Sequence, residues 1–149
     1  MKKYELTEET TNIFGKTLHR IRATRDFSNV HAGDLGGFIE DERNLSHDEN
    51  AWVGDEARVD GNALVYGNAL VKGTRDIYWI SCIGSRDGTT TFFRNADNGI
   101  SVSCGCFYGT IDEFAAAVTK THGDNEHAQA YRHAIEIAKL RIKLEDAES

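Results

Sequence analysis

A repeat with a period of six residues is the feature that most limits what this chain can fold into. Residues 51–73 read AWVGDEARVDGNALVYGNALVKG, in which a valine returns at every sixth position. A helical pattern repeats every 3.6 residues and a strand pattern every 2, so neither explains this spacing. A short extended segment followed by a turn does explain it, because the glycine and asparagine between the valines suit turns.

Repeats of this length are typical of parallel β-helices, and the pattern resembles the left-handed hexapeptide β-helix of many acyltransferases. Ile39 and Leu45 before the repeat, and Ile77 after it, continue the same spacing once a two-residue excess before Val53 is allowed for. Since three hexads make one coil, the sequence predicts a short left-handed parallel β-helix of about two coils.

So short a β-helix would expose much of its apolar edge, because stacked repeats need neighbours and caps to cover their ends. We therefore expect the chain to form a homo-oligomer, most simply a homotrimer. The side chains expected to be exposed and to make this interface are apolar: Trp52, Leu64, Tyr66 and Leu70.

The flanking sequence predicts two further regions. Residues 1–38 should form an N-terminal hairpin that turns near Gly15, with a glycine-rich capping loop before the β-helix of residues 39–76. Residues 77–149 should form an α+β module. Its three-stranded meander consists of DIYWISCIG, TTTFFR and ISVSCGCFY, with Asp-Gly and Asn-Gly turns between them.

Two α-helices should close this module. A Thr110–Glu113 capping box predicts the start of the first, and the second should run from about residue 126 to 144, before a frayed tail EDAES. The expected fold class is therefore mainly β with C-terminal helices.

Composition excludes several classes of function. The net charge of −7 argues against a general DNA- or RNA-binding protein, which usually has a basic surface. No apolar run is long enough for a membrane span, and the N-terminus does not read as a secretory signal, so we expect a cytoplasmic protein. Three cysteines in such a chain suggest reduced thiols, and the Cys104–Cys106 spacing is wrong for zinc, so we expect no metal and no cofactor.

Two sets of motifs resemble a known group of proteins. GDLGGFIE followed by hexads such as ARVDGNALVYGNALV resembles phage and prophage proteins with short hexapeptide β-helices. GSRDGTTTFF, VSCGCFYGTIDEF and THGDNEHAQAY resemble the C-terminal module that is often attached to them. The resemblance implies a phage-associated origin and brings no agreed biochemical activity.

We therefore expect a phage-encoded, non-enzymatic binding protein that inhibits bacterial immunity, by sequestering a nucleotide signal or by docking on a host defence protein. Arginine matches phosphate oxygens, aromatic rings stack on bases, and threonine hydroxyls bond phosphate or ribose. The candidate ligand-binding residues on these grounds are Arg20, Arg22, Arg25, Arg86, Thr90, Phe92 and Arg94. The alternative for each of them is an ordinary place on a solvated strand or in a sheet.

Three other functions stay open on the sequence. A hexapeptide-type acyltransferase would need a base, for which His47 in the two-residue insertion is the candidate. A metallohydrolase would use His122, His127 and His133, although their spacing matches no standard metal motif. A structural trimeric accessory module of a virion would suit the hexads equally well.

Overall fold

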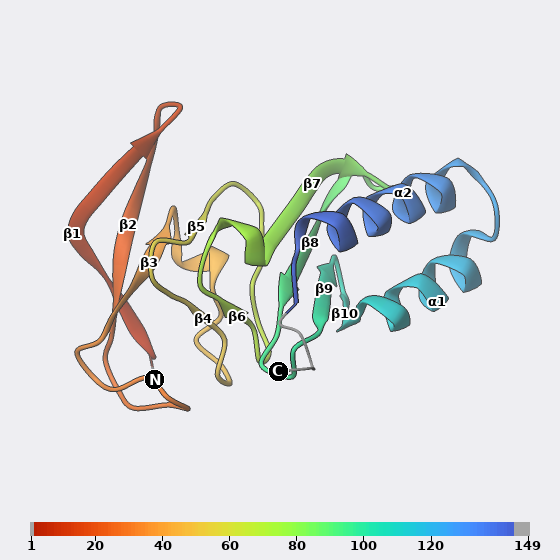
Figure 1. Ribbon diagram of the computed structural model, residues 1–149. Coiled ribbons are helices and arrows are strands. Elements are labelled where there is room, and N and C mark those ends of the chain that lie inside the picture. Colours follow the sequence, from red (N-terminus) through yellow and green to blue (C-terminus); the bar gives the residue numbers. More distant parts are fainter. Residues whose placement is uncertain (1, 145–149) are drawn as a thin grey trace. The chain divides into compact units, whose positions relative to one another are not determined.

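The computed structural model describes residues 2–144, and Figure 1 shows strands and connecting loops up to Thr110, followed by helices α1 and α2. The chain divides into two compact units at the junction between Thr74 and Arg75. Within the described residues the expected class, mainly β with C-terminal helices, is confirmed. The tail expected at residues 145–149 lies outside the described residues.

The first unit is built on a four-stranded mixed sheet. Strands β1 (Tyr4–Ile13) and β2 (Lys16–Ala23) form the expected hairpin, which turns at Gly15 with φ of 83°. β2 pairs antiparallel with β3 (Leu35–Ile39), and β3 pairs parallel with β5 (Arg58–Val59). Gly36 and Gly37 of the predicted capping loop thus lie in a strand of this sheet, whereas Gly33 lies in the turn before it.

The prediction of a left-handed parallel β-helix is wrong. Strands β4 (Trp52–Val53) and β6 (Leu70–Val71) form a separate two-stranded parallel sheet, while β1 and β2 extend the other sheet by antiparallel pairing. The repeated valines are nevertheless fully buried: Val53, Val59, Val65 and Val71. The six-residue spacing therefore marks inward-facing positions, but two-residue strands divided between two sheets do not make a solenoid.

Two short 3-10 helices lie in the chain between these strands. The first, η1 (Glu42–Asn44), is capped by Asp41, whose side chain accepts the N–H of Arg43. The second, η2 (Thr74–Asp76), spans the junction between the units.

The second unit contains an antiparallel sheet in which neighbours in sequence are neighbours in space. Its strands are β7 (Ile77–Ile83), β8 (Gly88–Arg94), β9 (Ile100–Cys104) and β10 (Phe107–Thr110). The meander has four strands and not the predicted three, because the chain turns at Gly105, where φ is 58°, and Phe107 pairs back on Cys104.

Two helices pack on one face of this sheet (Figure 1). Helix α1 (Ile111–His122) begins with the predicted capping box, and α2 (Glu126–Arg141) is capped by Asn125, whose Oδ1 accepts the N–H of Ala128. The core between sheet and helices is aromatic and aliphatic, and its fully buried or nearly buried members include Phe92, Val102, Phe114, Tyr131, Ile135 and Ala138.

Candidate functional site

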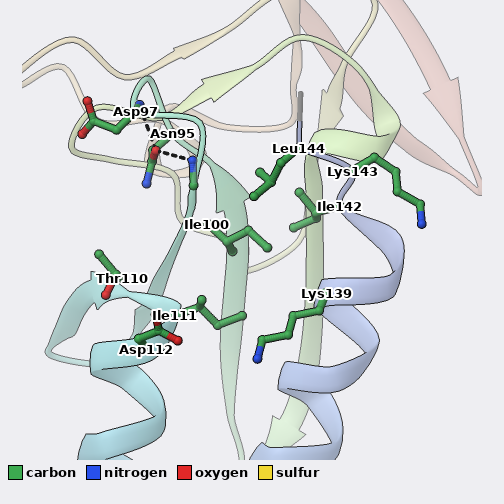
Figure 2. A pocket seen from close by; sticks show the side chains of 11 residues that line it. Asn95, Asp97, Ile100, Thr110, Ile111, Asp112, Lys139, Ile142, Lys143 and Leu144 are labelled. Carbon is green, nitrogen blue, oxygen red and sulfur yellow. Dashed lines mark hydrogen bonds between the residues drawn. The ribbon is translucent and has the colours of Figure 1, made fainter. Parts of the chain in front are cut away.

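A cavity of about 740 Å³ lies in the second unit where three segments meet (Figure 2). These are the turn between β8 and β9 (95–99), the start of α1 (110–112), and the end of α2 with the residues that follow it (139–144). Binding sites for small molecules typically have volumes of about 300–1,000 Å³. The cavity is therefore large enough for a small organic molecule.

The floor of the cavity is apolar. Ile100, at the start of β9, and Ile142, directly after α2, are 7% and 2% exposed, and both belong to the core of the unit. Ile111 and Leu144 complete the apolar lining from the two helix ends. Helix α2 ends at Arg141, so Ile142 and Leu144 reach the cavity from extended chain and not from a further helical turn.

Asn95 fixes the wall formed by the turn. Its Oδ1 accepts the N–H groups of Asp97 and Gly99, both at 3.0 Å, and its Nδ2 donates to the Ser101 hydroxyl at 2.8 Å. An asparagine that bonds the backbone two residues on is a standard way to hold a turn. The side-chain amide of Asn95 thus shapes the cavity, and the wall exists before any ligand binds.

Two opposite charges project toward one another at the helix ends. Figure 2 shows Lys139 of α2 reaching across the cavity toward Asp112 of α1, whereas Lys143 points away from it. Lys139 is also 3.9 Å from Glu136 on its own helix. The charged residues that line the cavity are two aspartates and two lysines, Asp97, Asp112, Lys139 and Lys143, so the lining carries no net charge.

Arg20 is bound by groups of the first unit. Its guanidinium pairs with Glu9 at 3.0 Å and Glu56 at 3.1 Å, and Nη1 donates to the carbonyl of Gly36 at 2.6 Å. It also lies 4.4 Å from the ring centre of Phe38. With a side chain only 12% exposed, Arg20 supports the fold and has little capacity left for a ligand.

The remaining candidate arginines belong to both units. Arg22 pairs with Glu5 across the β1–β2 hairpin. Arg25 lies 5.8 Å from the ring centre of Phe27 in the first unit. Arg86 is exposed in the turn between β7 and β8 of the second unit.

The predicted residues of β8 face inward. Thr90, Phe92 and Arg94 lie on the same side of the strand, because alternate residues share a face. Thr90 and Phe92 are 0% exposed and Arg94 is 8% exposed. The Thr90 hydroxyl donates to the sulfur of Cys104 at 3.1 Å, and Phe92 packs edge-on against Phe114. Thr90 and Phe92 are thus core residues and not a ligand surface.

The residues expected at an oligomer interface differ in exposure. Trp52 is 7% exposed and packs edge-on against Phe27, so the expectation that it is exposed is wrong. Leu64, Tyr66 and Leu70 are partly exposed. Because the homotrimer was expected from the β-helix, its structural ground is lost with that fold, and oligomerisation stays a prediction.

His47 does not have a nitrogen available for acyl transfer. Its Nδ1 accepts the backbone N–H of Lys3 at 3.0 Å, so Nε2 carries the ring proton and donates to Glu42 at 2.8 Å. Hydrogen bonds from His47 and from Lys2 hold the pKa of Glu42 below its usual value. The imidazole also stacks on Tyr4 at 4.0 Å between ring centres. The acyltransferase alternative therefore loses its candidate base.

The histidines near the helix junction do not form a metal site. His122 and His127 lie 5.5 Å apart between ring centres, and His133 is exposed. Among residues 2–144, His, Cys, Asp and Glu side chains do not come together in a group of three or more that could hold a metal ion.

Two comparisons with known proteins returned nothing: no family model matches the chain, and no curated protein is significantly similar to it. Within residues 2–144, the helices are too short or too polar to cross a membrane. The cavity of the second unit is therefore the feature from which a function can be proposed.

Sequence reasoning identified the inner faces that make this cavity, but not the cavity itself. The alternation around Ile100 and the helical spacing that includes Ile142 both indicated core positions. Inward-facing side chains usually fill the space between them, and only the three-dimensional arrangement shows where they leave a gap. Asp112 and Lys139 were not among the residues that the sequence singled out.

Proposed function

We propose that this is a non-enzymatic binding protein whose second unit holds a small, mostly apolar molecule with one polar end. The observation that carries the proposal is the cavity of about 740 Å³ with its floor of Ile100, Ile111 and Ile142. Apolar walls with a few placed polar groups are typical of small-molecule sites. The ligand's apolar body would lie on the isoleucines, and its polar end would lie between Lys139 and Asp112.

The charges of the cavity do not favour a nucleotide as this ligand. A nucleotide signal carries phosphate charges, and its sites usually supply arginine or lysine in excess. Here the lining has two aspartates against two lysines, and Lys143 points away (Figure 2). A ligand with at most one negative charge, or with a neutral hydrogen-bonding end, fits this lining better.

A fluorescence titration with 1-anilinonaphthalene-8-sulfonate tests the proposal, because this probe combines aromatic rings with a single sulfonate. We expect saturable binding to the folded protein. Ile111→Phe should lower the affinity at least about tenfold by filling the cavity, which corresponds to about 1.4 kcal/mol. Ile137→Phe is the matched control, because Ile137 is 40% exposed on α2 and does not line the cavity. Equal effects of the two substitutions would contradict the proposal.

A second pair of variants tests the polar end. Lys139→Gln removes the ammonium group that projects into the cavity, whereas Lys143→Gln removes one that points away (Figure 2). We expect the first to weaken binding of the sulfonate about threefold to tenfold and the second to leave it unchanged. The reverse order would place the sulfonate elsewhere.

The biological role rests on the resemblance to phage proteins alone. We propose on that ground that the protein acts in the cytoplasm of an infected bacterium and that its ligand belongs to a host defence response. Native mass spectrometry of the protein purified from its expression host, before and after denaturation, checks this. The expected result is a releasable mass of a small molecule without phosphorus.

A further inference from the structure

A second cavity in the second unit contains a cysteine thiol. It has a volume of about 240 Å³ and lies between the sheet and the two helices. Cys104, the last residue of β9, is half-buried at this cavity. The walls are mostly aromatic and aliphatic, and the residues that matter here are Cys104, Phe107, Phe114, Ala117, His122 and Tyr131.

Two hydroxyl groups are directed at the Cys104 sulfur. The fully buried Thr90 hydroxyl donates a hydrogen bond to it at 3.1 Å, and the Tyr131 hydroxyl lies 3.7 Å from it. Burial, followed by the hydrogen bond to Cys104, raises the pKa of Tyr131 to about 12, so that this phenol keeps its proton. Donors placed in advance around an atom stabilise negative charge as it develops there.

A proton acceptor faces the same cavity. His122 is the last residue of α1, and its ring lies nearly parallel to that of Tyr131, with 5.9 Å between ring centres and 26° between planes. An imidazole beside a thiol is the usual group that takes up the thiol proton. Thr90 of β8 and Tyr131 of α2 thus direct their hydroxyls at the sulfur, and His122 lines the same cavity from the end of α1.

The two other cysteines lack this setting. Cys82 is exposed on the edge strand β7, and Cys106 is exposed in the turn between β9 and β10. Neither lines the cavity. They are therefore internal controls for the chemistry of Cys104, in the same chain and under the same conditions.

We propose that Cys104 is a covalent acceptor for small aromatic or conjugated electrophiles of the α,β-unsaturated carbonyl class, which bind in this cavity. The sulfur forms a bond to the β-carbon, and the carbon–carbon π bond breaks. Its electron pair passes to the carbonyl oxygen as an enolate. His122 takes the thiol proton and returns it to the α-carbon, so the addition needs no oxidant, reductant or leaving group.

The size and the walls of the cavity favour small aromatic or conjugated electrophiles. Phe107, Phe114 and Tyr131 offer rings against which a conjugated, flat molecule packs well. The charged groups of the second unit's other cavity, Lys139 and Asp112, do not line this one. No Asp, Glu, Lys or Arg of residues 2–144 lines this cavity, so a charged tail on the electrophile would lose its hydration without gaining a permanently charged partner.

Two maleimides test the proposal, because they share the reactive group and differ in the tail. N-phenylmaleimide carries an aromatic ring, and 3-maleimidopropionate carries a carboxylate. The rate of labelling at each cysteine is followed by peptide mass mapping. At Cys104 we expect the phenyl reagent to be favoured at least about tenfold over the charged one, whereas Cys82 and Cys106 show no such preference. The same preference at all three cysteines, or no labelling of Cys104, would overturn the proposal.

Substitutions at two neighbouring alanines distinguish the effect of filling the cavity from a general effect on the fold. Ala117 lines the cavity and Ala116 is exposed on α1. Ala117→Phe should slow labelling of Cys104 by the phenyl reagent at least about tenfold by occupying the space, and Ala116→Phe should not change it. If Cys104 is labelled at the same rate in both variants and in the unsubstituted protein, the reagent does not bind in this cavity and the proposal fails.

The role of His122 as the proton acceptor has a test of its own. His122→Gln should slow addition at Cys104 at least about tenfold, whereas His133→Gln, at an exposed position outside the cavity, should leave it unchanged. Thermal unfolding of both variants shows whether the fold is retained. An unchanged rate in a folded His122→Gln variant would remove His122 from the proposed step.

Discussion

The first unit, residues 2–74, bonds the buried side chains of Lys3 and Asn44 to backbone groups, whereas the second, residues 75–144, has two cavities beside its aromatic and aliphatic core. In the first, Lys3 is 0% exposed and donates to the carbonyl of Ala51 at 2.6 Å, and Asn44 is fully buried and bonded on both ends. The charged residues of this unit looked like ligand groups, yet Arg20 is bound internally. We therefore expect ligand binding in the unit that has cavities at its core, and not at Arg20 of the first unit.

The largest expected effect comes from the core of the second unit. Phe114 is 4% exposed and touches the rings of Phe92, Phe107 and Tyr131. Phe114→Ala should lower the free energy of unfolding of this unit by about 3–5 kcal/mol, because it removes an aromatic side chain and leaves a gap. Urea unfolding followed by circular dichroism at the helical band reports on it, since both helices of residues 2–144 lie in this unit. Phe14→Ala, at a fully exposed position, is the control and should change little.

The stability of the first unit should depend on pH through Lys3. Burial, followed by the nearby charge of Arg25, lowers the pKa of Lys3 from 10.5 to about 8. The folded state then binds fewer protons than the unfolded state between these values, so stability is lowest below pH 8 and rises with pH above it. From pH 8 to 10 we expect a gain on the order of 2 kcal/mol. Above pH 10 the raised pKa of Tyr4 opposes it.

Chemical unfolding at several pH values, followed by the fluorescence of Trp52 in a Trp79→Phe background, measures this gain. Lys3→Met should remove the pH dependence, because methionine keeps the apolar length of the side chain and loses the titrating group. A gain that persists in Lys3→Met would assign it to another group.

Removal of the buried Asn44 amide should lower the free energy of unfolding of the first unit by an intermediate amount. The Nδ2 of Asn44 donates to the carbonyls of Ala63 at 2.9 Å and Gly61 at 3.2 Å, and its Oδ1 accepts the N–H of Asp41 at 3.0 Å. Asn44→Ala should cost about 2 kcal/mol, because buried groups lose their partners. The same tryptophan signal measures it, and the exposed Asn50→Ala should have almost no effect.

The smallest expected effect is a gain in stability at the hairpin tip. Phe14 is fully exposed and has a φ of 50°, which asparagine tolerates better than a bulky residue does. Phe14→Asn should raise the free energy of unfolding of the first unit by about 0.5 kcal/mol or slightly more. An equal gain from Phe14→Ala would show that the backbone conformation is not its cause.

Local signals in the sequence predicted local structure well. The Thr110–Glu113 capping box marked the start of α1, and the Asp-Gly and Asn-Gly turns separated β7, β8 and β9. The two-residue turn at Gly105 was missed, because Cys104, Cys106 and their neighbours also read as one continued strand. Such signals work because their hydrogen bonds join residues close in sequence.

Pairing between distant segments was not predictable in the same way. The spacing of Val53, Val59, Val65 and Val71 showed which residues are buried, but not which strands pair with which. In the same way, the alternation of Arg20 and Arg22 suggested an open strand face. Glu56, which binds Arg20, lies far along the chain, and only the fold brings the two together. The cavity of the second unit depends on three such segments and was missed for this reason.

Methyl NMR of isoleucine-labelled protein tests the central claim most directly, because isoleucines lie in both units. On addition of 1-anilinonaphthalene-8-sulfonate, the account predicts that the signals of Ile100, Ile111 and Ile142 shift in a saturable way. Those of Ile21 and Ile39, buried in the first unit, should stay unchanged. Shifts confined to Ile21 and Ile39, or no shift at the three cavity isoleucines, would contradict the claim that the second unit holds the binding site.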